Sequence, residues 1–537
     1  MTAALAWFRP RTGDRALAGV LAVLQFAALT WYTLRYHEMW RDEVQAWLIA
    51  RDNGLPGLFA ELHYEGHPGL WHLLLFAPAH LGLPIAAMQV LHAGIAAATT
   101  WVLVRYSPFP PVVKVLFPFG YLASYEYGVI ARNYGLGVLL VFACCALLAA
   151  PRVRPHRVGA TLFLLAQTSA FAALLVPPLC LYAGLAAWAR RGGGPRRAAL
   201  WDGATVAAWA AAGLLAMWAQ MRPRPDTVGP IPAPSWDWIA QAVFRAMFPV
   251  VHSGTWFWER PAVMPGHAGL LVLAALAGPG VVLLLLRRPA VAALYALGVA
   301  ALVLAMHEHV AGAVRHHGFF YVLLLACLWL YLAEPGSGPV ATAEAAPAAA
   351  PVPVPRARAV VALLLLCLGV QVVGGARAFH ADGRYTFSNA RAAASVLRQE
   401  QYAGATLLFD GDYQGSPILG YLGRQGYYVN STDRSYVVWN LARLRYPTAE
   451  NVAGRAEGLA AAYGRPVVVV SATPLDEPRL DPVTVVAQPS TLPDEQYSIY
   501  LLRPAPAPTP EAPPTPTPEP VPEPAPEAPP AEGEAPR

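Results

Sequence analysis

Charged residues are scarce in this chain. Asp, Glu, Lys and Arg make up 13% of its 537 residues, whereas hydrophobic residues make up 56%. Because a typical soluble domain carries about 25% charged residues, a single soluble domain is excluded and a polytopic membrane protein is indicated. The formal net charge of +5 is small, and no nucleic-acid partner is expected.

Cysteine patterning, a cleavable leader and a glycine-rich phosphate loop are also lacking. The cysteines all fall inside apolar runs, which excludes a disulfide framework or a zinc motif: Cys144, Cys145, Cys180, Cys327 and Cys367. The N-terminus carries Arg9, Arg11 and Arg15 before an apolar run but no small-residue cleavage site, so a retained first span is expected. The segment GDYQGSP at 411–417 matches neither GxGxxG nor GxxxxGKS/T.

Apolar runs predict eleven membrane crossings, at 16–34, 84–104, 112–131, 133–150, 158–173, 175–190, 198–219, 264–286, 289–306, 317–333 and 359–375. A crossing needs about 20 residues, so the shorter run 69–83, which contains Pro78, is predicted as an interfacial or re-entrant helix. Arginine-rich segments at 152–157, 190–197 and 287–288 then all lie in the cytoplasm, with the N-terminus. The stretch 158–190 fits one bent span or two short ones; two fit the charges.

The chain is therefore predicted to have five parts. They are a transmembrane module (1–333), a Pro/Ala-rich cytoplasmic linker (334–358), a last transmembrane helix (359–375), an external α/β domain (376–503) and a disordered Pro/Glu-rich tail (504–537). Helices are expected at 384–403 and 449–463, and strands at 405–410, 466–471, 483–487 and 497–502. This order predicts a small domain with its own core.

The external segment 35–72 is polar and lies between apolar runs. Ionisable groups at a membrane face cost free energy unless they have partners or a function, so Asp42 and Glu43 are candidate catalytic residues. The alternative is a solvated helix start, where acidic side chains are favoured by the helix dipole. Glu65 and His67 lie in the turn before the interfacial helix and are candidate substrate-binding residues.

Further polar groups lie in the other external segments. Glu126 and Arg132, with Tyr134 close behind, either form an ion pair or border a polar crevice. The loop 220–263 contains four tryptophans, which are either interfacial anchors or part of a lid, since sugars pack on aromatic faces.

The turn 307–317 contains His307, Glu308, His309, Arg315 and His316. Its His-x-His spacing lacks the HExxH form of a zinc helix. A solvated turn, a phosphate site and a divalent-metal site all stay open for this turn.

The order of these parts resembles the polyprenyl-phosphate-sugar-dependent glycosyltransferases of the GT-C fold. The resemblance is to family-39-like members related to protein O-mannosyltransferases and aminoarabinose lipid A transferases, and it covers about residues 15–335. Asp42-Glu43 matches their Asp-Glu pair in the first external loop, and Arg132-Asn133-Tyr134 matches an Arg-x-Tyr motif. The segment 66–71, GHPGLW, is similar to their x-x-Pro-Pro-Leu-Tyr motif but has Gly69 in place of the second proline.

The resemblance implies inverting transfer of a sugar from a polyprenyl-phosphate donor to a lipid, glycan or protein acceptor. The reaction would take place at the external face of a bacterial cytoplasmic (inner) membrane. Asp42 would be the general base and Glu43 would orient it, while Arg132, Arg315 and His316 would bind phosphate. Glu126 would lie near the acceptor or a metal.

Two other functions remain open: a transporter or flippase for a lipid-linked glycan, and a non-catalytic membrane scaffold. Transporters commonly show internal repeats and polar groups near the middle of the membrane, and the sequence shows neither. A scaffold leaves the carboxylates of 35–72 unexplained.

Overall fold

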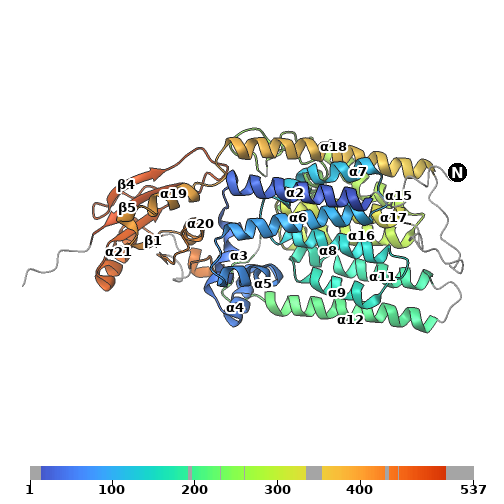
Figure 1. Ribbon diagram of the computed structural model, residues 1–537, viewed down its shortest axis with the longest axis horizontal. Helices are drawn as coiled ribbons and strands as arrows, with labels where there is room; N and C mark the ends of the chain where they lie inside the picture. The colour runs from blue at the N-terminus through green and yellow to red at the C-terminus, as the bar shows by residue number, and fades with distance from the viewer. Residues whose placement is uncertain are drawn as a thin grey trace, which may run out of the picture.

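The computed structural model describes residues 14–190, 196–229, 231–258, 260–333, 354–429, 435–444 and 447–503. The predicted tail, the linker up to residue 353, and Arg9 and Arg11 lie outside the described residues. The described chain forms a long helical bundle with a small sheet domain at one end (Figure 1). The predicted class, a polytopic α-helical membrane protein with a small C-terminal α/β domain, is confirmed.

Eight segments of the described chain are long and apolar enough to cross a membrane. They contain α2 (Asp14–Arg35), α6 (Ala86–Tyr106), α10 (Ala170–Ala173) with α11 (Val176–Arg190), α12 (Arg196–Met221), α14 (His267–Ala275) with η3 (Leu276–Gly280) and α15 (Val281–Leu285), α16 (Pro289–Glu308), α17 (Val314–Leu332) and α18 (Val354–Arg384). The protein buries 89% of the apolar window of α17, so this helix is the centre of the bundle. Helix α18 begins inside the range predicted for the linker and continues past the predicted crossing.

The other three predicted crossings are shorter or irregular. They contain α7 (Pro111–Leu116) with η1 (Phe117–Phe119) and the π-helical η2 (Leu122–Glu126), then α8 (Tyr134–Leu148) and α9 (Pro155–Ala166). Irregular backbone is tolerated at membrane depth where the protein satisfies its polar groups. Gln371 of α18 does so, because its side-chain oxygen accepts a hydrogen bond from the Leu122 N–H at 3.1 Å. The stretch 158–190 contains two separate segments, which are α9 and the span formed by α10 and α11.

Three short helices follow α2: α3 (Arg41–Asp52), α4 (Leu55–Glu65) and α5 (Leu70–His80). Gly66 ends α4 with a φ of 64°, a left-handed conformation that glycine adopts without steric cost. At 11 residues, α5 is about 16 Å long, too short to cross about 30 Å of hydrocarbon. The run 69–83 is therefore not a full crossing. Helix α13 (Trp236–Met247), capped by Ser235, lies in the loop between α12 and α14.

The C-terminal domain contains a five-stranded sheet with the order β2-β1-β3-β5-β4. Strands β2 (Tyr427–Tyr428), β1 (Thr406–Phe409) and β3 (Val467–Ser471) are parallel, whereas β5 (Tyr497–Leu502) and β4 (Asp481–Val486) form antiparallel pairs. The helices are α19 (Ala390–Leu397), α20 (Asp412–Leu422) and α21 (Ala449–Tyr463), with 3₁₀ turns η4 (Glu400–Tyr402) and η5 (Leu441–Leu444). Every predicted strand is present, whereas α20 and β2 were not predicted.

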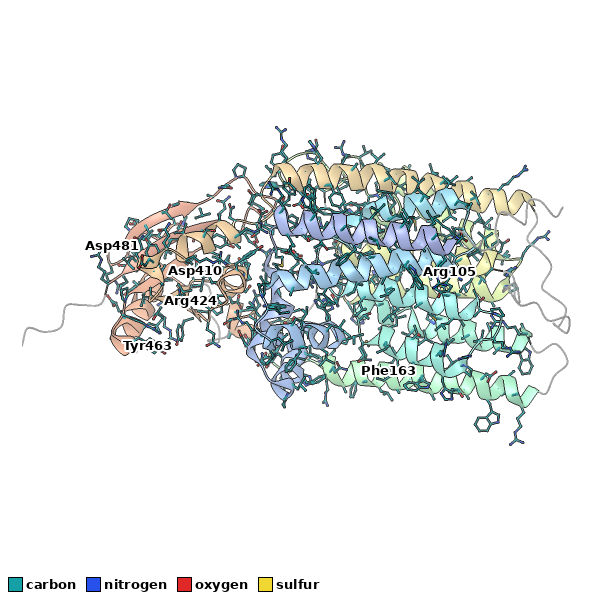
Figure 2. The ribbon with its side chains drawn as sticks, in the orientation of Figure 1. Arg105, Phe163, Asp410, Arg424, Tyr463 and Asp481 are labelled. Atoms are coloured by element: carbon teal, nitrogen blue, oxygen red, sulfur yellow. The ribbon has the colours of Figure 1, made fainter. Side chains whose placement is uncertain are left out.

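The domain lies against the end of the bundle that carries α3, α4 and α5 (Figure 1). Asp410 follows β1, and Figure 2 shows it nearer to the bundle than Tyr463 and Asp481. The parallel strands therefore direct their carboxyl ends towards the bundle. Helix α20 packs on α3 so closely that a Cβ added at Gly420 would lie 2.3 Å from Cγ1 of Val44.

Candidate active site

A cavity of about 670 Å³ lies where the helical bundle meets the C-terminal domain. Seven of the nine candidate residues line it: Asp42, Glu65, His67, Arg132, Tyr134, Arg315 and His316. They come from α3, from the end of α4 and the turn after it, from the segment before and at the start of α8, and from the start of α17. Glu43 and Glu126 are not among the cavity-lining residues of the described structure.

Asp42 is held by two arginines. Its Oδ2 lies 2.9 Å from Nη1 of Arg132 and 3.2 Å from Nη2 of Arg315. Burial alone would raise the pKa of Asp42, but the two guanidinium groups outweigh burial and keep this pKa below its usual value. Asp42 is therefore an ionised carboxylate at neutral pH, and its side chain is still 22% exposed.

Aromatic rings fix the position of Arg315. Its guanidinium carbon lies 5.6 Å from the Trp40 ring centroid and 5.5 Å from the Trp258 centroid. Cation–π contacts of this kind favour the charged group over the ring faces. Trp258 comes from the loop 220–263, and it lines the cavity, as Trp40 does. One of the four tryptophans of that loop is therefore part of the site.

Glu65 is the second carboxylate of the cavity. Burial raises its pKa to about 7, against the opposing effects of a hydrogen bond from Gln45 and the charge of Arg132. The Gln45 amide donates to Oε1 of Glu65 at 2.6 Å. Asp42 and Glu65 therefore differ in protonation behaviour, since one carboxylate is paired with guanidinium groups and the other is not.

Tyr134 lies between two histidines. Its hydroxyl oxygen is 3.1 Å from Nε2 of His67 and 2.8 Å from Nε2 of His316. Burial and the neighbouring Arg132 lower the pKa of His67 to about 3, so this ring is neutral at physiological pH. A neutral imidazole can accept or donate one hydrogen bond at each nitrogen, according to its tautomer. The three side chains form a polar, uncharged side of the cavity.

Several polar atoms of the cavity wall have no hydrogen-bond partner among the described residues. They include Trp40 Nε1, Trp71 Nε1, both ring nitrogens of His72, and Thr491 Oγ1. Each of these side chains is 5% exposed or less. Leaving a buried polar group without a partner costs about 1–3 kcal/mol, so the wall fits an occupant with several hydrogen-bonding groups. Sequence reasoning did not select these residues, although a histidine inside an apolar run, as at His72, is a usable signal.

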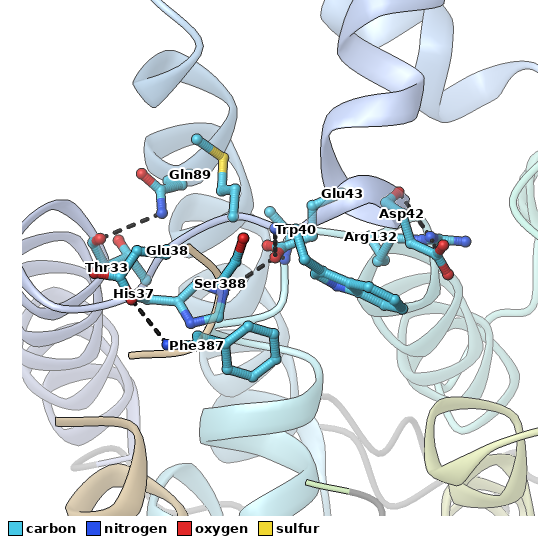
Figure 3. Close-up of polar contacts among 12 residues, drawn as sticks. Thr33, His37, Glu38, Trp40, Asp42, Glu43, Gln89, Arg132, Phe387 and Ser388 are labelled. Atoms are coloured by element: carbon cyan, nitrogen blue, oxygen red, sulfur yellow. Dashed lines mark hydrogen bonds and ion pairs between the residues drawn. The ribbon is translucent and has the colours of Figure 1, made fainter. Parts of the chain in front are cut away.

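Glu43 turns away from the cavity. Figure 3 shows Asp42 directed towards Arg132 and Glu43 lying on the side of His37. Its Oε2 lies 3.1 Å from Nε2 of His37, and its Oε1 accepts a hydrogen bond from the Ala131 N–H at 2.7 Å. The other ring nitrogen of His37 lies 3.1 Å from Asp382 of α18. Glu43 thus joins α3 to α18 and to the segment before α8, a structural contact rather than a place in the cavity.

Glu126 is also outside the cavity. Its Oε2 accepts hydrogen bonds from the Tyr121 hydroxyl at 2.7 Å and from Trp258 Nε1 at 3.1 Å. The side chain is 2% exposed. Of the two alternatives that the sequence left open, the ion pair with Arg132 is not formed, and Glu126 instead anchors the cavity-lining Trp258.

No group of three or more His, Cys, Asp or Glu side chains in the described chain could hold a metal ion. His307 stacks on Trp236 with ring centroids 4.6 Å apart, and residues 307–309 are not among those that line the cavity in the described structure. Cationic side chains, Arg132 and Arg315, neutralise the carboxylate of Asp42 instead. The positive charge that the cavity can offer an anion therefore comes from guanidinium groups.

A second, apolar cavity of about 400 Å³ adjoins the first. It lies between α10, α11, α12 and α16, and its lining includes Leu174, Leu181, Leu214 and Leu297. Ala170 lines both cavities. A hydrocarbon chain in the second cavity could therefore place a polar headgroup in the first.

Together, the fold and the cavity define an integral membrane protein with a polar, arginine-containing site beneath a small α/β domain. No protein-family model and no curated protein matches the sequence. One solved structure to which the chain is similar is ArnT from Cupriavidus metallidurans bound to undecaprenyl phosphate, with 13% identity and a TM-score of 0.48 over 91% of this chain and 98% of that chain. A second is the same protein in the apo state, with 14% identity and a TM-score of 0.43 over 90% of this chain and 97% of that chain.

ArnT is an aminoarabinose lipid A transferase of the GT-C fold, a group that the motifs of the first loop resemble.

Proposed function

We propose that this protein is a membrane glycosyltransferase that moves a sugar from a polyprenyl-phosphate donor to an acceptor hydroxyl. The observation that carries the proposal is the placement of one ionised carboxylate, Asp42, between Arg132 and Arg315 in a cavity at the end of a membrane bundle. In this proposal, the general base and the phosphate ligands lie side by side near the membrane face. A donor anchored in the lipid would present its anomeric carbon there.

The two arginines are the phosphate ligands in this proposal. Their side chains are 12% and 14% exposed and converge on one oxygen of Asp42. Guanidinium groups bind phosphate through paired N–H donors. Donor phosphate competes with Asp42 for these donors, so its arrival raises the pKa of Asp42 and makes this carboxylate a better base.

In the transfer step, the acceptor oxygen forms a bond to the anomeric carbon while the bond from that carbon to the phosphate oxygen breaks. The acceptor proton passes to the Asp42 carboxylate, which is general-base catalysis. The leaving polyprenyl phosphate keeps the electron pair, and Arg132 and Arg315 neutralise its charge. Attack from the face opposite the phosphate inverts the anomeric configuration.

The apolar cavity supports a lipid donor. Its leucine- and proline-rich lining lies between helices long enough to cross the membrane. The first isoprene units of the donor would occupy it while the phosphate lies beyond Ala170. We place this end of the bundle at the external face of a bacterial cytoplasmic membrane, because the arginine-rich loops 152–157 and 287–288 should be cytoplasmic.

The test is sugar transfer by the purified protein from a panel of polyprenyl-phosphate sugars, with Asp42→Asn as the variant. Loss of a general base costs about 10²–10⁴-fold in rate. Asp237→Asn is the control, since Asp237 is 48% exposed and pairs with His267 away from the cavity. Equal transfer by wild type and Asp42→Asn would remove Asp42 from the mechanism. If the folded protein transfers sugar from none of the donors, the result would favour a transporter or a scaffold function.

A further inference from the structure

The C-terminal domain forms one wall of the cavity. Tyr413, Val437, Trp439, Thr491 and Leu492 all belong to this domain, and all line the same cavity as Asp42 and Arg315. The membrane bundle alone therefore does not complete the site. The transfer step proposed above involves no residue of this wall.

The wall is made by the edge of the sheet where α/β domains bind ligands. Tyr413 lies four residues after β1, and Trp439 lies in the connection that follows β2. Both strands are parallel and direct their carboxyl ends towards the bundle, as the position of Asp410 in Figure 2 indicates. Loops at the carboxyl ends of parallel strands are the usual ligand-binding positions in open α/β sheets.

The charged groups at this wall take part in ion pairs. Nη1 of Arg41 lies 2.8 Å from Asp494 and 3.3 Å from Glu495. The Arg443 guanidinium pairs with Asp412, at 3.2 Å from Oδ1. The domain wall therefore differs from the opposite side, where two arginines share one carboxylate.

Two aromatic rings and a hydroxyl without a partner lie on this wall. Trp439 is 36% exposed, and the Arg443 guanidinium carbon lies 4.2 Å from its ring centroid. Tyr413 is half-buried, with the guanidinium carbons of Arg41 and Arg443 at 5.2 Å and 5.6 Å from its ring centroid. Thr491 is 5% exposed, and its Oγ1 has no hydrogen-bond partner among the described residues. Flat rings beside buried hydroxyl and paired charged groups suit an uncharged polyol, since sugars present both C–H faces and hydroxyls.

We propose that the C-terminal domain forms the acceptor subsite, in which Trp439, Tyr413 and Thr491 bind an uncharged carbohydrate acceptor opposite the arginines that hold the donor phosphate. This assignment rests on the proposed transferase function. It divides the cavity into a donor side on the bundle and an acceptor side on the domain.

Binding measured without turnover is the first test. Mannohexaose, cellohexaose and an arabinan hexasaccharide are titrated calorimetrically into the full chain in lipid nanodiscs. Trp439→Ala and Thr491→Val should each weaken binding at least tenfold. The controls are Leu441→Ala and Thr484→Val, because both residues are exposed and lie outside the cavity lining; they should stay within twofold. Absence of binding to all three probes, or equal binding by Trp439→Ala, would overturn the proposal.

Steady-state kinetics is the second test. In Trp439→Ala, the KM for the carbohydrate acceptor should rise at least tenfold, while the dissociation constant for undecaprenyl phosphate changes less than twofold. Transfer to a peptide or to a lipid without sugar, with a KM that Trp439→Ala leaves unchanged, would overturn the acceptor assignment and keep the transferase. Carbohydrate binding by a folded protein that transfers from no donor would instead overturn the transferase and with it the acceptor assignment.

Discussion

Asp42 and Glu43 are neighbours in the chain but have different surroundings. Successive residues of an α-helix are rotated by about 100°, so the side chains of Asp42 and Glu43 leave α3 in different directions. Asp42 meets the two arginines, whereas Glu43 meets His37 behind the helix. The pair in the sequence therefore separates into a site residue and a structural residue.

Glu65 should set the acid limb of the pH profile. Because its pKa is raised to about 7 mainly by burial, it gains a proton as the pH falls below that value, and the cavity then loses a negative charge and gains an O–H donor in its place. We expect kcat/KM to fall by up to about tenfold per pH unit below pH 7. The measurement is kcat/KM from pH 5 to 8 for the wild type and for Glu65→Gln, in which this limb should vanish. Glu61→Gln, outside the cavity lining, should retain it, and a flat wild-type profile would contradict the prediction.

His37 should make stability depend on pH. Burial alone would lower its pKa, but Asp382 and Glu43 outweigh burial and raise it to about 10. The folded protein thus binds this proton more tightly than the unfolded chain, whose histidine has a pKa of about 6.5. The stabilisation is complete below that value and is lost as the pH rises towards 10.

His37→Gln should therefore lower the melting temperature at pH 6 and flatten its decline between pH 7 and 10. Breaking a buried ion pair costs about 3–5 kcal/mol. His380→Gln on the exposed face of α18 is the control and should behave as the wild type. A wild-type melting temperature that stays constant to pH 10 would argue against a charged His37.

Seven of the cavity-lining residues could be selected from the sequence because they are polar residues in segments between apolar runs. Thr491 could not, since a single threonine in a loop carries no pattern and its role depends on contacts across the whole chain. Glu126 was misplaced for a related reason: its partners, Tyr121 and Trp258, are set by the packing of η2 and by a distant loop. Spacing along the chain does not report such packing.

At the scale of elements, the contact between α3 and α20 fixes the domain over the site. A Cβ at Gly420 would lie 2.3 Å from Val44 and 3.1 Å from Ile85. Gly420→Ala should therefore weaken docking by about 1–3 kcal/mol, the usual cost of overpacking. The measurement is the rate of limited proteolysis between α18 and α19, which should rise. Gly454→Ala in α21, where nothing lies within 4 Å, should not increase cleavage.

The elements that the sequence missed are short or interrupted. Strand β2 has two residues, too few to show alternation. Helix α20 contains Pro417 and two glycines, which are unfavourable in isolated helices, and it is stabilised by packing on β1 and α3. Long apolar helices and buried valine-rich strands were predictable because their signal is local.

At the scale of the whole molecule, the proposed orientation can be measured. A cysteine introduced at Tyr463, which is 47% exposed at the far end of the domain, should react with a membrane-impermeant maleimide added to intact spheroplasts. A cysteine at Arg287, exposed in a turn of the bundle, should react only after lysis. The chain without added cysteine is the blank, because four of its five native cysteines are buried. The reverse pattern would invert the topology.

The residues that line the cavity are synthesised at widely separated times. Asp42 belongs to the first loop to emerge after α2, whereas Thr491 and Leu492, on the opposite wall, follow nearly at the end of the described chain. The ribosome must therefore extend the chain as far as Leu492 before every wall of this cavity is present. In the proposal above, in which the C-terminal domain forms the acceptor subsite, a shorter nascent chain cannot bind an acceptor.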